Sequence, residues 1–421
     1  MAHPTWLTPY EAGKVIEGVI KGNDIKRPLL FQQQFGNVNT TWRDTINLDL
    51  EFDKRNVMGT FAEPQADMNP IQLPNFGTME FSFAYAKEAV GSPDYSELSQ
   101  RMLGQQQDAV ALTNLASQYA QNISEKMKLA YQRIENLKEW TAAQVLLYGK
   151  CTAQSQYHHT VKWDFQRPVY TGSSLTTQTA RDADRDAVLL GELVSEVDLT
   201  TLKANTTTNV GGGLSWDSFD NISGTPTAIT PANIQTAADP IKQFNRMLEV
   251  AAYRTGTDKV IMSSDAYAWF NNQLNSNPSY LRTFDSTINT NISMVQEIVP
   301  WVKTIEGLML RRMWDCGNGN IVPIYTYEGV YHDRLTGVRT PYMPKGYVLL
   351  VPPPNYGLQR YGKIMHQKAG WQAMPTWINH WLNEKTGIEE WELHTNFVFA
   401  HTDMRSAVCW KVCTTPPAAV V

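Results

Sequence analysis

Residues 105–148 read QQQDAVALTNLASQYAQNISEKMKLAYQRIENLKEWTAAQVLLY, a stretch without glycine or proline that is bounded by Gly104 and Gly149. Apolar residues recur in it every three or four positions, which is the period of one helix face. At 1.5 Å per residue, a helix of about 40 residues is roughly 60 Å long, twice the diameter of a small domain. The stretch therefore predicts a long spine helix. Its apolar stripe consists of Leu112, Leu115, Tyr119, Ile123, Met127, Ala130, Ile134 and Leu137.

Two alternating stretches precede this helix. RDTINLDLEF (43–52) and TMEFSFAYA (78–86) place apolar side chains at every second position, the pattern of half-buried strands. The residues between them carry Pro64, Pro70 and Pro74, so the pair predicts a long hairpin with a wide, irregular tip. A lone two-stranded hairpin is marginal in water, so its apolar face needs a cover. The cover is either the rest of this chain or another molecule.

The remainder of the chain contains irregular segments, helix patterns and strand patterns. Residues 1–36 are punctuated by proline and glycine and predict an irregular arm. Strands mixed with helices over the middle of the chain predict an α/β or α+β domain. Helices are predicted at 180–197, at 231–256 with a break or restart at Pro240, and at 265–275 behind a serine cap. Strands are predicted at 258–264, 307–314, 320–329 and 346–353, and as two alternating runs within 389–413.

Composition excludes several classes of protein. No apolar run approaches the roughly 20 residues of a membrane span, and the first residues do not resemble a secretory signal. Four cysteines among 421 residues predict a reducing compartment. Lys+Arg 36 against Asp+Glu 41 argues against a dedicated nucleic-acid binder. Charged residues, at 18%, fall below the roughly 25% of soluble domains, and this is typical of surfaces that become buried against partners.

A search for catalytic motifs yields no candidate. The chain has no phosphate-binding loop, dinucleotide fingerprint, nucleophile elbow or zinc-protease motif. The glycine run at 211–213 lacks the residues that would make it a phosphate cradle, so a surface loop is favoured. Asp182, Asp184 and Asp186 have the spacing of a calcium loop, but Leu193 stands at the chelating twelfth position.

One His/Cys group is a candidate metal site, and one histidine pair is a candidate for catalysis. His401, Cys409 and Cys413 lack a second ligand pair in range, and in an alternating strand the two cysteines would share one face as small hydrophobes. His158 and His159 lie in a linker, where solvated side chains are expected. We therefore predict no catalytic residue, no cofactor and no metal, and a protein that is not an enzyme.

The order of these parts resembles the major capsid proteins of tailed phages, with the HK97-like fold, and more narrowly the lambda-type branch. Four stretches carry the resemblance: a spine-helix end, a strand followed by an Asp-led helix, a proline turn with an apolar strand, and a closing strand. They are QRIENLKEWTAAQVLLYGKCT (132–152), DKVIMSSDAYAWFNN (258–272), PYMPKGYVLLVPPPNYGLQRYGKI (341–364) and DMRSAVCWKVC (403–413).

The resemblance implies an α+β fold with five parts. They are an N-terminal arm (1–36), an extended hairpin loop (37–87), a peripheral domain with the spine helix (88–164), an axial domain (165–352), and return strands of the peripheral domain with the C-terminus (353–421). The Thr/Asn-rich stretch around 200–230 departs from the shorter members of the family and leaves the edges of the axial domain open.

The resemblance also implies a function in the virion. Copies would assemble in the host cytoplasm as hexamers and pentamers into an icosahedral head that encloses double-stranded DNA without sequence-specific binding. The implied partners are copies of the chain, a separate scaffolding protein, a portal protein and, as an open point, a decoration protein; no membrane and no covalent crosslink are expected. The interface residues expected on neighbouring copies are Trp42, Arg43, Lys54, Arg55, Phe61, Phe76, Phe81 and Phe83.

Two alternatives stay open at this point. An encapsulin-like compartment would share the fold and hold cargo proteins instead of a genome. A glycan-active or glycan-binding protein would also explain the aromatic residues and the Asn/Thr richness, although its enzyme form needs a carboxylate pair in a cleft that the sequence does not identify.

Overall fold

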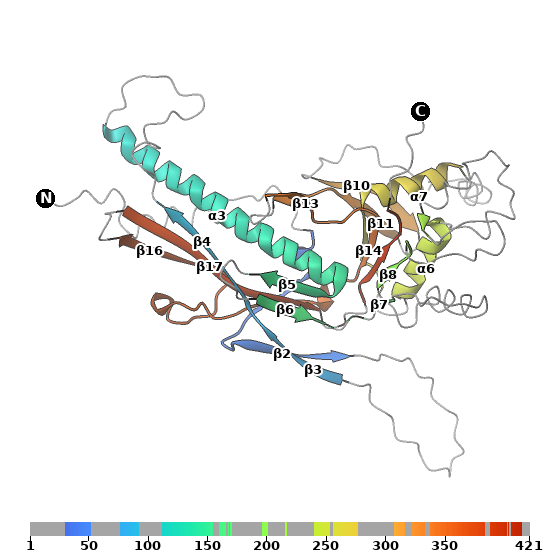
Figure 1. The fold of residues 1–421 in the computed structure, drawn as a ribbon, viewed down its shortest axis with the longest axis horizontal. Helices are drawn as coiled ribbons and strands as arrows, with labels where there is room; N and C mark the ends of the chain where they lie inside the picture. Colours follow the sequence, from blue (N-terminus) through green and yellow to red (C-terminus); the bar gives the residue numbers. More distant parts are fainter. Residues whose placement is uncertain are drawn as a thin grey trace, which may run out of the picture.

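The structure is a computed structural model in which a long helix lies along one sheet, and a second sheet with its own helices lies where that helix ends (Figure 1). Helices pack against sheets that contain both parallel and antiparallel strand pairs, and this mixed architecture confirms the expected α+β class. The residues that the structure describes are 30–51, 76–91, 112–154, 160–165, 167, 169–170, 196–200, 215–216, 240–252, 256–276, 307–315, 321–332, 337–383, 388–401, 403 and 406–414.

The long helix α3 spans Leu112–Tyr148 and confirms the predicted spine helix over the described residues; residues 105–111 lie outside them. Ile123 and Ile134 are buried in one cluster with Trp391 of the underlying sheet. This part of the stripe therefore faces the sheet as its period predicts. The side chains of Leu112, Leu115 and Tyr119 lie outside those that the structure describes. Within the described residues, no helix is both long enough and apolar enough to cross a membrane.

The prediction that Leu137 belongs to the buried stripe is wrong. Leu137 keeps 39% of its surface exposed, whereas Lys138 and Ala142 are buried. The reason is geometric: positions four apart share a helix face, so Lys138 and Ala142, not Leu137, continue the line from Ile134.

The first sheet contains the longest strand of the described chain, β17 (Ile388–His401). On one side β17 pairs antiparallel with β4, and on the other with β16 along one half and β15 along the other half. β1 adds to β15 in parallel. The helix α3 lies along one face of this sheet (Figure 1). The partner strands are β1 (Asn37–Thr40), β4 (Ala84–Gly91), β15 (Gly357–Tyr361) and β16 (Trp377–Asn383).

The second sheet has, among the described residues, the strand order β10-β11-β9-β14-β18-β8-β7. Two helices, α6 (Pro240–Ala252) and α7 (Ser264–Ser276), share its apolar core. The predicted serine cap is present, because the Ser263 hydroxyl accepts the Ala266 N–H at 3.3 Å. The strands are β7 (Val169–Tyr170), β8 (Glu196–Asp198), β9 (Lys259–Met262), β10 (Leu308–Asp315), β11 (Ile321–Tyr327), β14 (Tyr347–Val351) and β18 (Val408–Lys411).

One of the predicted helices differs from the structure at residues that the structure describes. The helix expected over 180–197 would end in Glu196 and Val197, but these residues form β8 beside β18; the rest of that range lies outside the described residues. Its apolar residues suit a helix or a strand, and pairing with β18 decides for the strand. Within the helix expected over 231–256, the structure describes α6 from Pro240, the predicted restart, where proline fits the first turn of a helix. Residues 231–239 lie outside the described residues.

The remaining elements are short. The pairs are β2 (Thr45–Glu51) with β3 (Phe76–Ser82), β5 (Lys150–Gln154) with β6 (Thr160–Asp164), and β12 (Val330–His332) with β13 (Arg339–Pro341). Three 3-10 turns are η1 (Gln32–Gln34), η3 (Pro354–Tyr356) and η4 (Gln367–Ala369). The five domain ranges given above stay predictions.

A buried arginine joins the end of α3 to the second sheet. Arg167 Nη1 donates to the carbonyl oxygens of Leu146 at 2.7 Å and Leu147 at 3.1 Å, and Nη2 donates to the Ala407 carbonyl. These helix carbonyls have no partner within the helix, so a cation there is favourable. Gly149 ends the helix with φ 61°, and a side chain there would collide with Arg167.

The buried face of α3 can be tested with a matched pair of charges. Ile134 is 1% exposed and Leu129, on the same helix, is 56% exposed. Ile134→Asp is expected to lower the free energy of unfolding by about 4 kcal/mol or more, because a charge replaces an apolar side chain in the core and the neighbouring Lys138 is already paired with Glu135. Leu129→Asp is expected to change it by less than about 1 kcal/mol. Denaturant unfolding followed by circular dichroism measures both; equal effects would contradict the assignment of the buried face.

Candidate assembly surface

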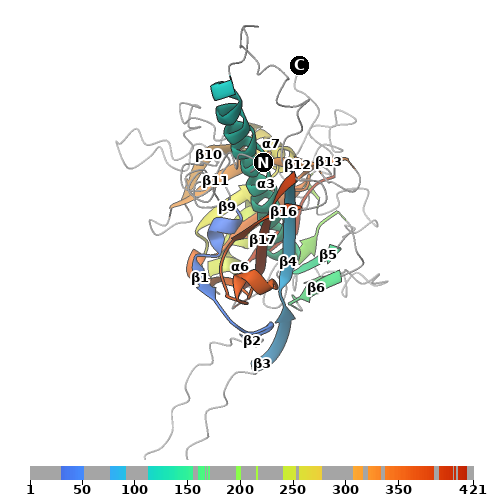
Figure 2. The same ribbon diagram turned by 90° about the vertical axis from the view of Figure 1, so that its left-hand side faces the viewer.

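The β2–β3 hairpin leaves the body of the molecule at its lower edge (Figures 1 and 2). Its register pairs Ile46 with Phe81 and Leu48 with Met79, so the apolar residues of the two strands share one face, as their alternation predicts. A cross-strand bond from the Thr45 hydroxyl to Glu80 Oε1 at 2.5 Å lies on the other face. The predicted strand pair is confirmed.

The root of this hairpin is covered by the chain itself. Phe81 contacts the ring of Phe165 at 4.5 Å between centroids, and the Trp163 indole donates to the Ser82 carbonyl at 2.7 Å. Ile46 and Phe81 belong to the same core cluster as the C-terminal part of α3. Of the two covers left open by the sequence, the rest of this chain therefore covers the root.

This finding corrects two of the expected interface residues. Phe81 and Phe83 are 4% and 6% exposed within the single chain. The backbone of Gly362 lies against the Phe83 ring, where a Cβ would come within 2.9 Å. Both phenylalanines are core residues and present no surface to a neighbouring copy. Alternation reveals which face of a strand is apolar, and it does not reveal which molecule covers that face.

The other six expected interface residues fall into three groups. Trp42 is 67% exposed and Arg43 is exposed, both on the turn between β1 and β2. Phe76 is the first residue of β3, opposite Glu51. The last group, Lys54, Arg55 and Phe61, lies outside the described residues. Trp42 and Arg43 thus stay predicted interface residues that are accessible in the free chain.

The junction that precedes the hairpin is held by a carboxylate from α3. Glu139 Oε1 and Oε2 accept the backbone N–H groups of Phe31 and Gln32, each at 2.9 Å. These groups begin η1, which has no cap from its own side chains, so Glu139 caps this turn from the spine helix. Burial raises the pKa of Glu139 to about 7, although the N–H donors oppose the rise. No local signal in the sequence marks this contact, because its partners are more than 100 positions apart.

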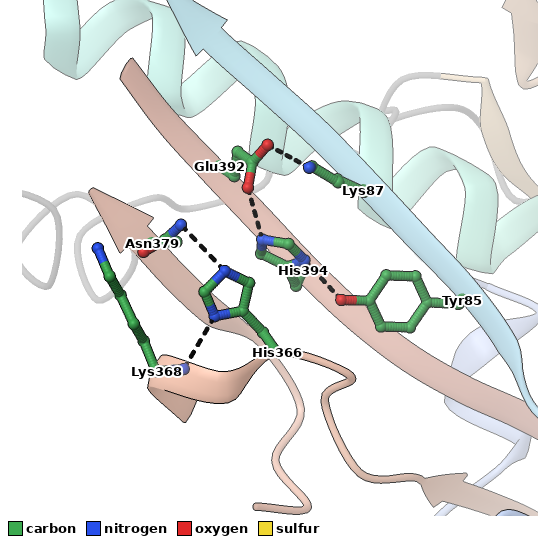
Figure 3. Close-up of polar contacts among 7 residues, drawn as sticks. All are labelled: Tyr85, Lys87, His366, Lys368, Asn379, Glu392 and His394. Atoms are coloured by element: carbon green, nitrogen blue, oxygen red, sulfur yellow. Dashed lines mark hydrogen bonds and ion pairs between the residues drawn. The ribbon is translucent and has the colours of Figure 1, made fainter. Parts of the chain in front are cut away.

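The face of the first sheet turned away from α3 carries a buried polar chain (Figure 3). Tyr85 O–H donates to His394 Nδ1 at 2.6 Å, and His394 Nε2–H donates to Glu392 Oε2 at 3.1 Å. Lys87 binds the other oxygen of Glu392. The register of β4 on β17 sets Lys87 opposite His394, so strand pairing builds the cluster.

This chain of groups resembles a catalytic relay, but its electrostatics do not suit one. Burial, with a further contribution from the Glu392 charge, raises the pKa of Tyr85 to about 12. Burial also holds the pKa of His394 below its usual value, against the effect of Glu392. The phenol therefore stays protonated near neutral pH and donates a hydrogen bond instead of acting as a nucleophile. The arrangement fastens β4 to β17.

A second histidine covers this cluster. His366 stacks on Trp377 with 4.6 Å between ring centroids, and its Nδ1 accepts the Lys368 N–H at 3.1 Å. The ring of His366 lies 5.6 Å from that of His394 (Figure 3). The loop that carries His366 is thereby fixed to the outer face of the sheet.

The histidine and cysteines weighed as metal ligands are core residues. His401 is buried at the end of β17, stacks on Tyr356 and accepts the Asp403 N–H at Nδ1. Cys409 and Cys413 are buried, but in different clusters, because β18 ends at Lys411; their expected shared face is wrong. Across the described ranges, His, Cys, Asp and Glu form no group that could hold a metal ion. The earlier candidates at 158–159, 182–186 and 211–213 lie outside those ranges.

Comparison with known proteins gives a match in structure. No family model and no curated protein matches the sequence. A prophage protein of E. coli CFT073, assigned as a capsid protein, aligns over 94% of this chain and 97% of its own, with a TM-score of 0.54 and 15% identity. Agreement over nearly the full length of both chains decides the fold. This chain has the HK97-like capsid fold.

Two further solved structures align over most of their length at lower scores. A chain of the capsid of cyanophage P-SCSP1u covers 92% of this chain and is covered to 89%, with a TM-score of 0.41 and 9% identity. A chain of the SrpI encapsulin complex of Synechococcus elongatus PCC 7942 covers 91% of this chain and is covered to 88%, with a TM-score of 0.38 and 8% identity. The predicted HK97-like fold is confirmed by the E. coli prophage protein alone. The narrower likeness to the lambda-type branch stays a prediction.

Within this HK97-like chain, two buried groups titrate in opposite directions. Burial raises the pKa of Glu139 to about 7 and lowers that of His401 to about 4. The stability due to Glu139 is present below about pH 4.5 and is lost as pH rises to 7. The stability due to His401 is present above about pH 6.5 and is lost as pH falls to 4.

Glu139→Gln and His401→Gln are therefore expected to change the pH profile of stability with opposite slopes. Relative to wild type, the free energy of unfolding of Glu139→Gln should rise by up to about 3 kcal/mol between pH 4.5 and 7, and that of His401→Gln should fall by a similar amount. Denaturant unfolding across this range measures both. Two profiles parallel to wild type would show that neither group titrates as described.

Proposed function

We propose that this chain is a major capsid protein, whose copies assemble as hexamers and pentamers into the icosahedral head around the double-stranded DNA of a tailed phage. The observation that carries the proposal is the HK97-like capsid fold over nearly the whole chain. The E. coli prophage protein with which it shares that fold is itself assigned as a capsid protein.

The projecting hairpin supports assembly with neighbouring copies. β2 and β3 leave the body from a root that is fixed by Phe81 and Trp163, so the hairpin is held in one direction (Figure 2). The exposed Trp42 lies directly before β2. A large exposed aromatic residue of this kind is typical of sites that become buried on association.

The charge balance supports enclosure of DNA without tight binding. With Lys+Arg 36 and Asp+Glu 41, the chain has a net charge of −5. Phosphate binding requires clusters of Lys and Arg that release counterions, and a mildly acidic shell leaves packaged DNA free. We propose that the chain acts structurally and not as an enzyme, because the protein with which it shares its fold is assigned as a capsid protein.

The proposed partners follow from this role. Besides its own copies, the chain would meet a separate scaffolding protein during assembly in the host cytoplasm, and a portal protein at one vertex. A decoration protein on the outside is a further proposed partner. The mature location would be the capsid of the virion.

Expression of the full chain tests the proposal. Size-exclusion chromatography and negative-stain electron microscopy are expected to show capsomers or closed shells, and shells from the native source should contain double-stranded DNA. Shells filled with a cargo protein would favour the encapsulin reading. A stable monomer that binds polysaccharide would favour the glycan reading and overturn the proposal.

Shortening the hairpin is expected to uncouple folding from assembly. Removal of residues 57–75 leaves β2 and β3 intact and keeps 52–56 as a connecting turn. The subunit should keep its wild-type melting temperature, because the root contacts at Phe81 and Trp163 remain. It should fail to form closed particles in electron microscopy. The control replaces residues 57–75 with a Gly/Ser segment of equal length, which separates the effect of hairpin length from that of side-chain contacts. Normal particles from the shortened chain would contradict the role of the hairpin.

A further inference from the structure

The loop between β15 and β16, residues 362–376, is closed on itself by short-range bonds. Lys363 and Ala373 form an antiparallel bridge, and the Ile364 N–H donates to the Gln372 carbonyl at 2.9 Å. At the tip, the Gln372 N–H donates to the Ala369 carbonyl at 3.3 Å across a tight turn. Such bonds give the loop one defined shape.

The turn at the tip holds a tryptophan in an unfavourable backbone conformation. Gly370 has φ 62° and Trp371 has φ 58°. Two successive residues in the left-handed region form the turn that normally takes Asn and Gly, since a bulky side chain is strained there. Trp371 is the one described non-glycine residue with positive φ, and half of its surface is exposed. Burial within the subunit therefore offsets only part of this strain.

A second large apolar side chain is exposed on the same loop. Met365 lies two positions after the bridge residue Lys363, and Trp371 lies two positions before its bridge partner Ala373. Met365 is 53% exposed. The loop thus presents a Met–Trp pair to solvent, and strained residues of this kind concentrate at binding sites, where the surrounding structure holds them in place.

The loop is fixed to the body on its inner side. Ile364 and Ala369 are buried, and the ring of His366 stacks on Trp377 above the polar cluster of the sheet (Figure 3). The Met–Trp pair is therefore presented by a rigid support. A preorganised side chain loses little conformational entropy on docking.

The loop is also continuous with the proposed assembly surface. Lys363 forms an ion pair with Asp44 at 2.7 Å, which joins the loop to the turn that carries Trp42 and Arg43. Residues 362–376 include Lys363 and Lys368 and no acidic residue. A partner that receives this tip is thus expected to offer an apolar pocket with an acidic or neutral rim.

We propose that the Met365–Trp371 tip is a docking point for a second copy of this chain, separate from the β2–β3 strand pair. The inference rests on the proposed function, because a shell subunit must contact several copies of itself. Docking buries the indole and the thioether on the neighbour, and this burial offsets the strain of the turn that the free subunit carries.

Two substitutions test the proposal through different physical effects. Trp371→Ala removes the ring and keeps the strained turn, whereas Trp371→Asn removes the ring and supplies a residue that tolerates the left-handed region. Each is expected to raise the subunit concentration at which particles form by about tenfold or more. The free Trp371→Asn subunit should melt at or about 1 °C above the wild-type temperature. Light scattering and differential scanning fluorimetry on the full chain measure the two effects.

Gln372→Ala, in the same turn, is the matched control and should assemble as wild type. Hydroxyl-radical footprinting adds a second measure: Met365 and Trp371 should be oxidised in free subunits and protected in particles. Wild-type assembly of both Trp371 variants, or a large loss of stability in the free Trp371→Asn subunit, would overturn the docking role while leaving the proposed function standing. A wild-type chain that never assembles would overturn the proposed function, and the docking role with it.

Discussion

The buried guanidinium of Arg167 is the contact on which the arrangement of the two sheets depends. A helix that ends inside a protein leaves its last carbonyl groups without partners, and this costs free energy unless a donor reaches them. Arg167 supplies that donor to Leu146 and Leu147 and at the same time reaches the carbonyl of Ala407, just before β18. The end of α3 and the second sheet are thereby joined by one polar side chain, beside the apolar core that they share. Gly149 completes the junction, since only a residue without Cβ fits beside the arginine.

The same helix organises the start of the described chain through a second buried charge. Glu139 caps η1 from across the fold, and Phe31 and Phe35 on either side of that turn pack onto Tyr327 and Phe399. The arm therefore meets the body at a fixed point, and β1 and the hairpin follow from there. The Glu139 carboxyl group binds backbone N–H groups, so the contact does not require particular side chains at Phe31 and Gln32. Its strength depends on pH because burial raises its pKa to about 7.

Prediction from the sequence succeeded where the signal lies in neighbouring residues, and it failed where the outcome depends on a contact with a residue distant in the sequence. Three predictions that hold each depend on residues close together in the sequence. They are the period of the stripe around Ile123 and Ile134, the Ser263 cap, and the alternation of β2 and β3. The burial of Phe81 depends on Phe165, 84 positions away, and the cap at η1 depends on Glu139.

The candidate surface was harder to predict than the fold for the same reason. Trp42 was recognisable as a large aromatic residue beside a strand, and it is exposed. The sequence did not mark Trp371, because this residue is a candidate only through its positive φ and its place in the loop closed by the bridge between Lys363 and Ala373. The polar chain from Tyr85 to Glu392 was hidden too: each residue alternates normally within its own strand, and only the pairing of β4 with β17 brings them together.

The cover over the root of the hairpin changes how assembly has to be understood. If Ile46 and Phe81 needed a neighbour, the free subunit would expose a core and aggregate. Because Phe165 and Trp163 cover that root, the root needs no neighbour, and in the proposed assembly the subunit would fold first and associate afterwards through residues at its surface. Contacts of this kind are individually weak, and a closed shell multiplies them, since each further contact within a forming ring is made at high effective concentration. Weak single contacts also let misplaced subunits leave, which a closed and regular shell requires.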